Sequence, residues 1–146
     1  GQVCAVLVAD CVPILVADRQ RRCVAAVHAG WRGLAAGVIA HTIDALPVSP
    51  NALVACIGPA IGNTVFEVGL EVLAAFRAVG IEPVHHGQPG DWRVDLRGTA
   101  WHLLQCAGVS MVTAIGGCTA TAADDYFSYR RDGVTGRLAG FVAIDG

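Results

Sequence analysis

Residues 3–33, with the sequence VCAVLVADCVPILVADRQRRCVAAVHAGWRG, decide the fold of this chain. The apolar run at residues 3–9 is typical of a strand that is covered on both faces. Residues 14–17 and 24–28 have the composition of two further strands, and the charged segment 18–22 lies between them. This order predicts a β-hairpin close to the start of the chain.

Strand-like and helix-like segments alternate through the rest of the chain. We expect helices at residues 31–46, 67–79 and 95–107, strands at residues 53–57, 112–115 and 137–144, and a loop-rich surface excursion at residues 80–93. Asp95 is a suitable N-cap for the last helix, and Gly108 is a suitable stop. The pattern predicts one α/β domain of the α+β type over residues 1–146, with a mixed β-sheet flanked by helices.

The hairpin predicts a pair of chemically active side chains. A two-residue loop at Arg19 and Gln20 would place Asp18 opposite Arg21, and the same register places Cys11 opposite His28. Directly opposed Cβ atoms lie ~4.5–5.5 Å apart, so both side chains could bind one metal ion or form a Cys–His pair. A slip of the register would reduce this to a diagonal contact.

Composition excludes several classes of partner. A net charge of −2 gives no electrostatic footprint for nucleic acid, and no apolar run is long enough to span a bilayer. Most of the six cysteines lie among apolar residues, as buried free thiols do, which favours a reducing, cytoplasmic setting. The chain starts directly in a core strand, so we expect a domain whose upstream part is missing.

Charged residues surround the Cys–His pair. Asp10 is a candidate to orient a metal-binding histidine, or it simply caps a turn. Arg32 and the start of the helix after Gly30 are candidates to bind an anion such as phosphate. The simpler interpretation is a buried thiol at Cys11 and a histidine at the end of a strand at His28. Two ligands do not complete a catalytic zinc site, and the chain has no HxE or CxxC motif.

Five short motifs run in order along almost the whole chain. They are ADCVP at residues 9–13, HAGWRG at 28–33, IGPAIG at 57–62, FEV at 66–68 and FSYRRDG at 127–133. In this order they resemble the laccase-domain, YfiH-like family, whose fold is similar to the catalytic domain of the cytotoxic necrotizing factors, cysteine hydrolases. HAGWRG and FSYRRDG are individually specific, so coincidence is a poor explanation.

The resemblance implies a zinc-dependent purine nucleoside enzyme. The family is viewed as purine nucleoside phosphorylases, which use phosphate with adenosine, inosine or methylthioadenosine and also have adenosine deaminase activity. It implies a zinc ion held by His, Cys and His, in which Cys11 and His28 match the second and third ligands. The first ligand belongs to an upstream segment that is not among these residues. Copper is possible only through the family's older label.

The FSYRRDG motif supplies two further candidates. Arg130 and Arg131 follow Tyr126, Phe127 and Tyr129, a set of side chains able to stack a purine and bind phosphate. The alternative is a surface loop whose aromatic side chains anchor it to the core.

Three other functions compete with the nucleoside enzyme. A cysteine hydrolase or deamidase would use Cys11 as a thiolate and His28 as its base. A polyphenol oxidase would need several coppers, yet the sequence has no cluster of paired histidines. A non-catalytic module would follow if the whole protein also lacked the upstream histidine.

Overall fold

The structure is a computed structural model that describes residues 3–78, 80–83, 85–86 and 92–144. In chain order the elements are β1 (Val3–Val8), β2 (Val12–Asp18), β3 (Val24–Ala29), α1 (Trp31–Ala35), α2 (Val38–Ala45), a 3₁₀ turn η1 (Pro50–Ala52), β4 (Leu53–Ile57), β5 (Glu67–Val68), α3 (Leu70–Ala78), β6 (His85–His86), β7 (Trp92–Val94), α4 (Leu96–Cys106), β8 (Met111–Ala114), α5 (Tyr129–Asp132) and β9 (Leu138–Ala143). The predicted α/β order is confirmed.

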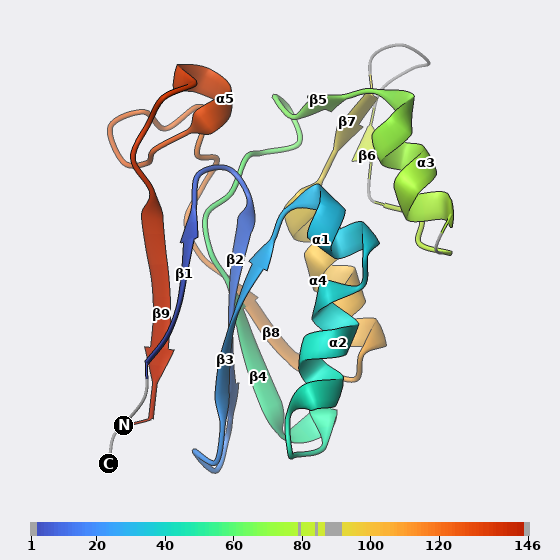
Figure 1. The fold of residues 1–146 in the computed structure, drawn as a ribbon, viewed down its shortest axis with the longest axis vertical. Coiled ribbons are helices and arrows are strands. Elements are labelled where there is room, and N and C mark those ends of the chain that lie inside the picture. The colour runs from blue at the N-terminus through green and yellow to red at the C-terminus, as the bar shows by residue number, and fades with distance from the viewer. Residues whose placement is uncertain (1–2, 79, 84, 87–91, 145–146) are drawn as a thin grey trace.

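A four-stranded sheet forms the middle layer, as Figure 1 shows. Its strand order is β3-β2-β4-β8, with antiparallel pairing except between β4 and β8, which run parallel. This arrangement confirms the predicted mixed sheet. The parallel step is possible because the long connection between β4 and β8 includes α3 and α4, which return the chain to the same end of the sheet.

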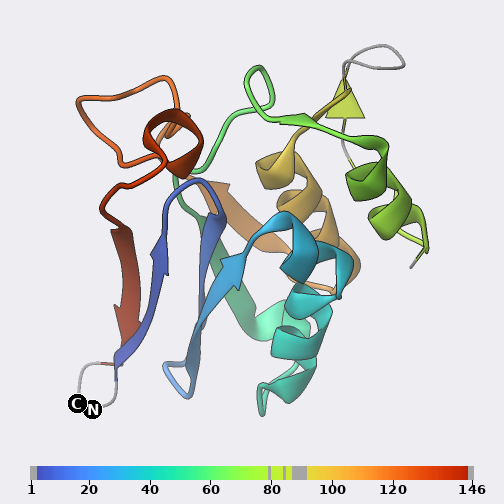
Figure 2. The ribbon, with the colours of Figure 1, turned by 45° about the horizontal axis from the view of Figure 1, so that its top comes forward.

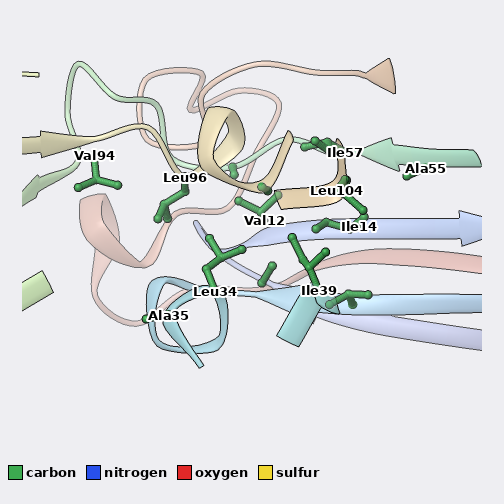
Figure 3. Close-up of a cluster of buried hydrophobic side chains, with 14 of the residues drawn as sticks. Val12, Ile14, Leu34, Ala35, Ile39, Ala55, Ile57, Val94, Leu96 and Leu104 are labelled. Carbon is green, nitrogen blue, oxygen red and sulfur yellow. The ribbon is translucent and has the colours of Figure 1, made fainter. Parts of the chain in front are cut away.

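Helices α1, α2 and α4 cover one face of this sheet. Alternate residues of the strands point into that layer, among them Ile14 and Ile57, and they meet Leu34, Ile39 and Leu104 from the helices (Figure 3). All five side chains are buried. Burial of each such side chain contributes about 1.5–3 kcal/mol relative to leaving it in water. The core therefore lies between the sheet and the helices.

The opposite face of the sheet is covered by a second, two-stranded sheet. β1 and β9 pair antiparallel, with Val3 opposite Ala143 and Val8 opposite Leu138, and they pack over β2 and β3. The far side of this pair is open, since Val3 is 62% and Leu7 is 59% exposed. The expectation of a strand covered on both faces was therefore wrong for these residues, because no described element lies outside the β1–β9 pair.

Two of the three predicted helices differ in detail from the observed ones. The helix expected at residues 31–46 is broken between α1 and α2, where Gly37 has a φ of 78°. The helix expected from residue 67 begins at Leu70 instead. Glu67 and Val68 pair with β7, and this long-range pairing overrides their helical spacing.

The third predicted helix is confirmed. The Asp95 carboxylate accepts a hydrogen bond from the Gly98 backbone N–H at 2.8 Å, so Asp95 caps the first turn of α4. Gly108 follows the helix with a φ of 88°, the left-handed conformation in which glycine ends helices.

Short strands interrupt the predicted surface excursion at residues 80–93. β6 and β7 pair antiparallel there, while residues 84 and 87–91 of the predicted loop lie outside the described residues. Within the described part of the chain, no helix is both long and apolar enough to cross a membrane.

Candidate functional site

The hairpin of β2 and β3 has a different register from the predicted one. Pro13 lies opposite His28 and Val12 lies opposite Ala29. Cys11, one residue before β2, therefore lies against Gly30 and not opposite His28. The direct Cys11–His28 pairing was therefore wrong by two positions. Side chains alternate across a strand with a period of two, so extending this register by one residue beyond β2 keeps Cys11 and His28 on the same face, as diagonal neighbours.

The loop at the closed end of the hairpin explains the shift. Four residues, 19–22, form the loop, and Arg21 adopts a positive φ of 59°. The Asp18 carboxylate accepts hydrogen bonds from the backbone N–H groups of Gln20 and Arg22, and the Arg22 guanidinium donates two more at 2.7 and 3.0 Å. These bonds lower the Asp18 pKa to about 2. A wider loop satisfies these groups better than a two-residue turn would.

Asp10 fixes the open end of the hairpin. It lies in the bend between β1 and β2, has a positive φ of 84° and is 9% exposed. Its carboxylate accepts a hydrogen bond from the Thr119 hydroxyl at 2.6 Å and another from the Arg130 backbone N–H at 2.7 Å. Its backbone carbonyl accepts from the Ile61 N–H at 3.0 Å. Asp10 thus ties together segments that are distant in the sequence, and its partners are not histidines.

Cys11 is held against the glycine at the start of α1. A Cβ added to Gly30 would lie 2.7 Å from the Cys11 Sγ, so only glycine leaves room for the sulfur. Burial raises the pKa of the Cys11 thiol, and the negative charge of Asp10 raises it further. A thiol in this environment stays protonated near neutral pH unless a cation stabilises the thiolate.

His28 and Arg32 complete the open end. Both side chains are exposed, and the Arg32 guanidinium stacks on the Trp31 ring 4.2 Å from its centroid. Among the described residues Arg32 has no side-chain hydrogen bond or ion pair, so its donors are free for an anion. α1 has only five residues, so its dipole adds less than the predicted long helix would.

The guanidinium groups of Arg130 and Arg131 have partners within the chain. Arg130 stacks on Phe66 and donates to the Glu67 backbone carbonyl at 3.2 and 3.3 Å. Arg131 donates to the carbonyls of Thr119 and Tyr126 and to the Asp132 carboxylate. Both side chains fasten the FSYRRDG segment to its surroundings. The segment itself reaches the Cys11 bend, and Figure 2 shows α5 beside the turn between β1 and β2.

Thr119 is a site residue that the sequence did not reveal. It is fully buried, and its hydroxyl bonds to Asp10 across 109 positions of sequence. Thr119 follows a Gly-Gly-Cys turn, and nothing in the local sequence indicates that its side chain is buried. The neighbouring Cys118 accepts a hydrogen bond from the Gly62 N–H at 3.1 Å. Burial raises the pKa of the Cys118 thiol, but hydrogen bonds from Thr121 and from backbone N–H groups, including that of Gly62, outweigh burial and lower the pKa.

The apolar cavity nearest to this end of the hairpin does not include the Cys–His pair. An apolar cavity of about 330 Å³ lies between β9 and the outer face of the sheet, and its lining includes Pro13, Cys56 and Gly140 but neither Cys11 nor His28. The described residues contain no group of three His, Cys, Asp or Glu side chains placed to hold a metal ion. A metal bound by Cys11 and His28 therefore needs a further ligand from elsewhere.

Comparison with known proteins agrees with the motifs. The family model described as multi-copper polyphenol oxidoreductase laccase matches residues 1–145. The purine nucleoside phosphorylase YfiH of Shigella flexneri is 44% identical over 146 residues, an alignment that covers 97% of this chain and 59% of the relative. A purine nucleoside phosphorylase of Pseudomonas aeruginosa is also 44% identical, with 97% and 60% covered.

Solved structures show the same fold. The crystal structure of a Neisseria meningitidis protein superposes with a TM-score of 0.94 at 45% identity, covering 99% of this chain and 61% of that one. The chain thus spans about three-fifths of the length of the relatives that it matches. It belongs to the multi-copper polyphenol oxidoreductase laccase family, whose YfiH-like members bear the name purine nucleoside phosphorylase.

Proposed function

We propose that the whole protein is a zinc-dependent purine nucleoside phosphorylase, and that Cys11 and His28 are two of its zinc ligands. The observation that carries this proposal is the placement of both side chains on one face at the open end of the β2–β3 hairpin. The names of the relatives support the phosphorylase reaction. The third ligand would come from the part of the protein outside residues 1–146.

The donor set fits zinc. A thiolate and an imidazole are ordinary zinc ligands, and zinc would supply Lewis acidity, either to polarise a substrate oxygen or to activate water for deamination. A cation beside Cys11 would reverse the effect of burial and of Asp10 on its pKa. Cys11 is held in place by Gly30 and by the hydrogen bonds of the preceding Asp10, so its sulfur is preorganised for a metal.

Arg32 is the best-placed group to bind phosphate. Its guanidinium is exposed, stacked on Trp31 and free of side-chain partners among the described residues. Phosphate held there would be oriented to attack the anomeric carbon of a nucleoside, with adenosine, inosine and methylthioadenosine as the substrates that we propose. Arg130 and Arg131 contribute by fixing the loop that contains Tyr126 and Phe127, which would contact the purine.

The cysteine hydrolase is the second candidate, because Cys11 and His28 also suit a nucleophile and its base. The raised pKa of Cys11 weighs against it, since a hydrolase of this kind needs a thiolate in the free enzyme. An oxidase with several coppers is less suitable still, because several coppers need many more ligands than one zinc ion, and the described residues offer no three-ligand cluster even for one.

The test is phosphorolysis of inosine by the whole protein together with its zinc content. Cys11→Ala and His28→Ala should each abolish release of hypoxanthine and reduce bound zinc. Cys23→Ala, at the far end of the same hairpin, and His41→Ala, an exposed histidine of α2, are the matched controls and should retain both. Wild-type turnover in either site variant would refute the proposal. Activity that survives zinc removal and a covalent adduct at Cys11 would favour the hydrolase.

A further inference from the structure

We propose that the part of the whole protein outside residues 1–146 packs against an apolar groove beside β9. We call this surface the β9 groove and define it by Leu15 of β2, Val54 and Cys56 of β4, Met111 and Thr113 of β8, and Ile115. The residues are the outward-facing positions of the middle sheet, opposite to the helix layer. The inference is independent of the catalytic proposal, because it depends on packing alone.

Register places the members of the groove on one face. Leu15 lies opposite Cys56, and the parallel pairing sets Val54 beside Met111 and Cys56 beside Thr113. The alternate positions Leu53, Ala55 and Ile57 point to the helices and are buried. The groove side is different, because Met111 is 51% and Ile115 is 58% exposed. The middle sheet therefore has one face buried in the core, and about half of its other face is exposed to water.

The β1–β9 sheet covers only the other half. It packs over β2 and β3, whereas β4 and β8 have no layer above them among the described residues (Figure 1). β9 forms the wall of the groove, with Leu138 and Gly140 at one end and Val142 at the other. Two cavities along it, of about 330 and 410 Å³, both include Leu15 and Cys56 in their lining. The surface is therefore hollowed and apolar.

Exposed apolar side chains gather around β9 on both sides. Nine large hydrophobic side chains are exposed among the described residues, and five of them, Val3, Leu7, Phe141, Met111 and Ile115, lie on β1, on β9 or in the groove. Val3, Leu7 and Phe141 lie on the outer face of the β1–β9 pair, and Met111 and Ile115 lie in the groove. Exposed apolar surface of this kind marks an interface. β8 is also the edge strand of this sheet in the part of the chain that the structure describes, and such an edge is normally covered.

The length of the relatives identifies the occupant. Alignments cover almost all of this chain but only 59–60% of the Shigella flexneri and Pseudomonas aeruginosa proteins. About two-fifths of a protein of that length thus lies outside the residues described. A segment of that size is available in every molecule at a high effective concentration, which a separate partner lacks. We therefore assign the groove to this segment of the same chain.

The test measures thiol accessibility in the whole protein. Met111→Cys lies in the groove, and Leu70→Cys, 63% exposed at the start of α3, is a matched control on the opposite side of the molecule. Site-resolved mass spectrometry would follow maleimide labelling of each under native conditions and after unfolding in urea. We expect native labelling of the Met111→Cys variant to be slower than that of the Leu70→Cys variant by about tenfold or more, because covered sites react only through opening.

Three outcomes would overturn the proposal. They are equal labelling rates at the two positions, slow labelling of both, and protection of position 111 that disappears on dilution to the monomer, which would assign the groove to a second copy. If the substitution impairs folding, hydrogen exchange in the unaltered whole protein gives the same answer at Val112 and Ala114, whose N–H groups point away from β4. Slow exchange there supports coverage of the β8 edge, and exchange as fast as in an exposed loop contradicts it.

Discussion

The two ends of the β2–β3 hairpin are built in opposite ways. At the closed end, the Asp18 carboxylate binds groups no more than four positions away, and Arg19 adds hydrogen bonds to the carbonyls of Asn51 and Ala52. At the open end, Asp10 binds Thr119 and Arg130, which lie 109 and 120 positions away. The Asp18 loop and its bonds to the residues before β4 set the register, while contacts over more than one hundred positions assemble the candidate site. Damage at the two ends should therefore have different consequences.

Asp10→Asn should have the largest effect. Asparagine tolerates the positive φ of this position, but it offers one acceptor where the carboxylate uses two. The loss should be about 2–3 kcal/mol of unfolding free energy, because hydrogen bonds to a buried charged group are among the stronger ones. Urea unfolding measures the stability, and inosine phosphorolysis should fall in parallel. Unchanged stability would show that the open end does not depend on Asp10.

Thr119→Val should have the next largest effect. Valine keeps the buried volume but leaves one oxygen of Asp10 without its donor. We expect a loss of about 1–2 kcal/mol, in the range for a buried group left unsatisfied. Thr119→Ser retains the hydroxyl and should recover most of the zinc content and activity. If the serine variant behaves like the valine variant, the methyl group and not the hydrogen bond is what matters.

Gly30→Ala should separate site geometry from stability. The added Cβ would lie 2.7 Å from the Cys11 Sγ, so the sulfur must move. Overpacking at this half-exposed position should cost only about 1 kcal/mol, the lower end of the usual range. Zinc content and turnover should fall much more than thermal stability. The control is Gly117→Ala, where an added Cβ meets nothing within 4 Å, and it should change neither property.

The smallest effect should come from acid, which weakens the Asp18 loop at the closed end of the hairpin. The Asp18 pKa is about 2 in the folded chain against an ordinary 3.8, so its contribution to stability is present above pH 4 and is lost as the pH falls towards 2. Arg22 is half exposed, and solvent screening keeps the contribution modest. Thermal unfolding between pH 5 and 2 should show a steeper decline for the wild type than for Asp18→Asn. Parallel curves would assign the acid sensitivity to other carboxyl groups.

Sequence by itself determined the order of the elements and the identity of the key side chains. Apolar patterning located β2, β3, β4 and α4, since burial on one face requires a fixed period. The motifs around Cys11, His28 and Arg130 are enough to indicate the family, which the match over residues 1–145 confirms. Local signals such as the Asp95 cap were reliable, because their partners lie within one turn of the chain.

Tertiary structure decided the register, the helix break and the contacts of the site. The register depends on how the Asp18 loop satisfies its hydrogen bonds, and the first turn of the expected helix at residue 67 gave way to pairing with β7. The bond between Thr119 and Asp10 joins residues whose proximity no local pattern records. The open face of β1 and the β9 groove likewise emerge only in three dimensions, because the sequence shows which residues are apolar but not which layer covers them.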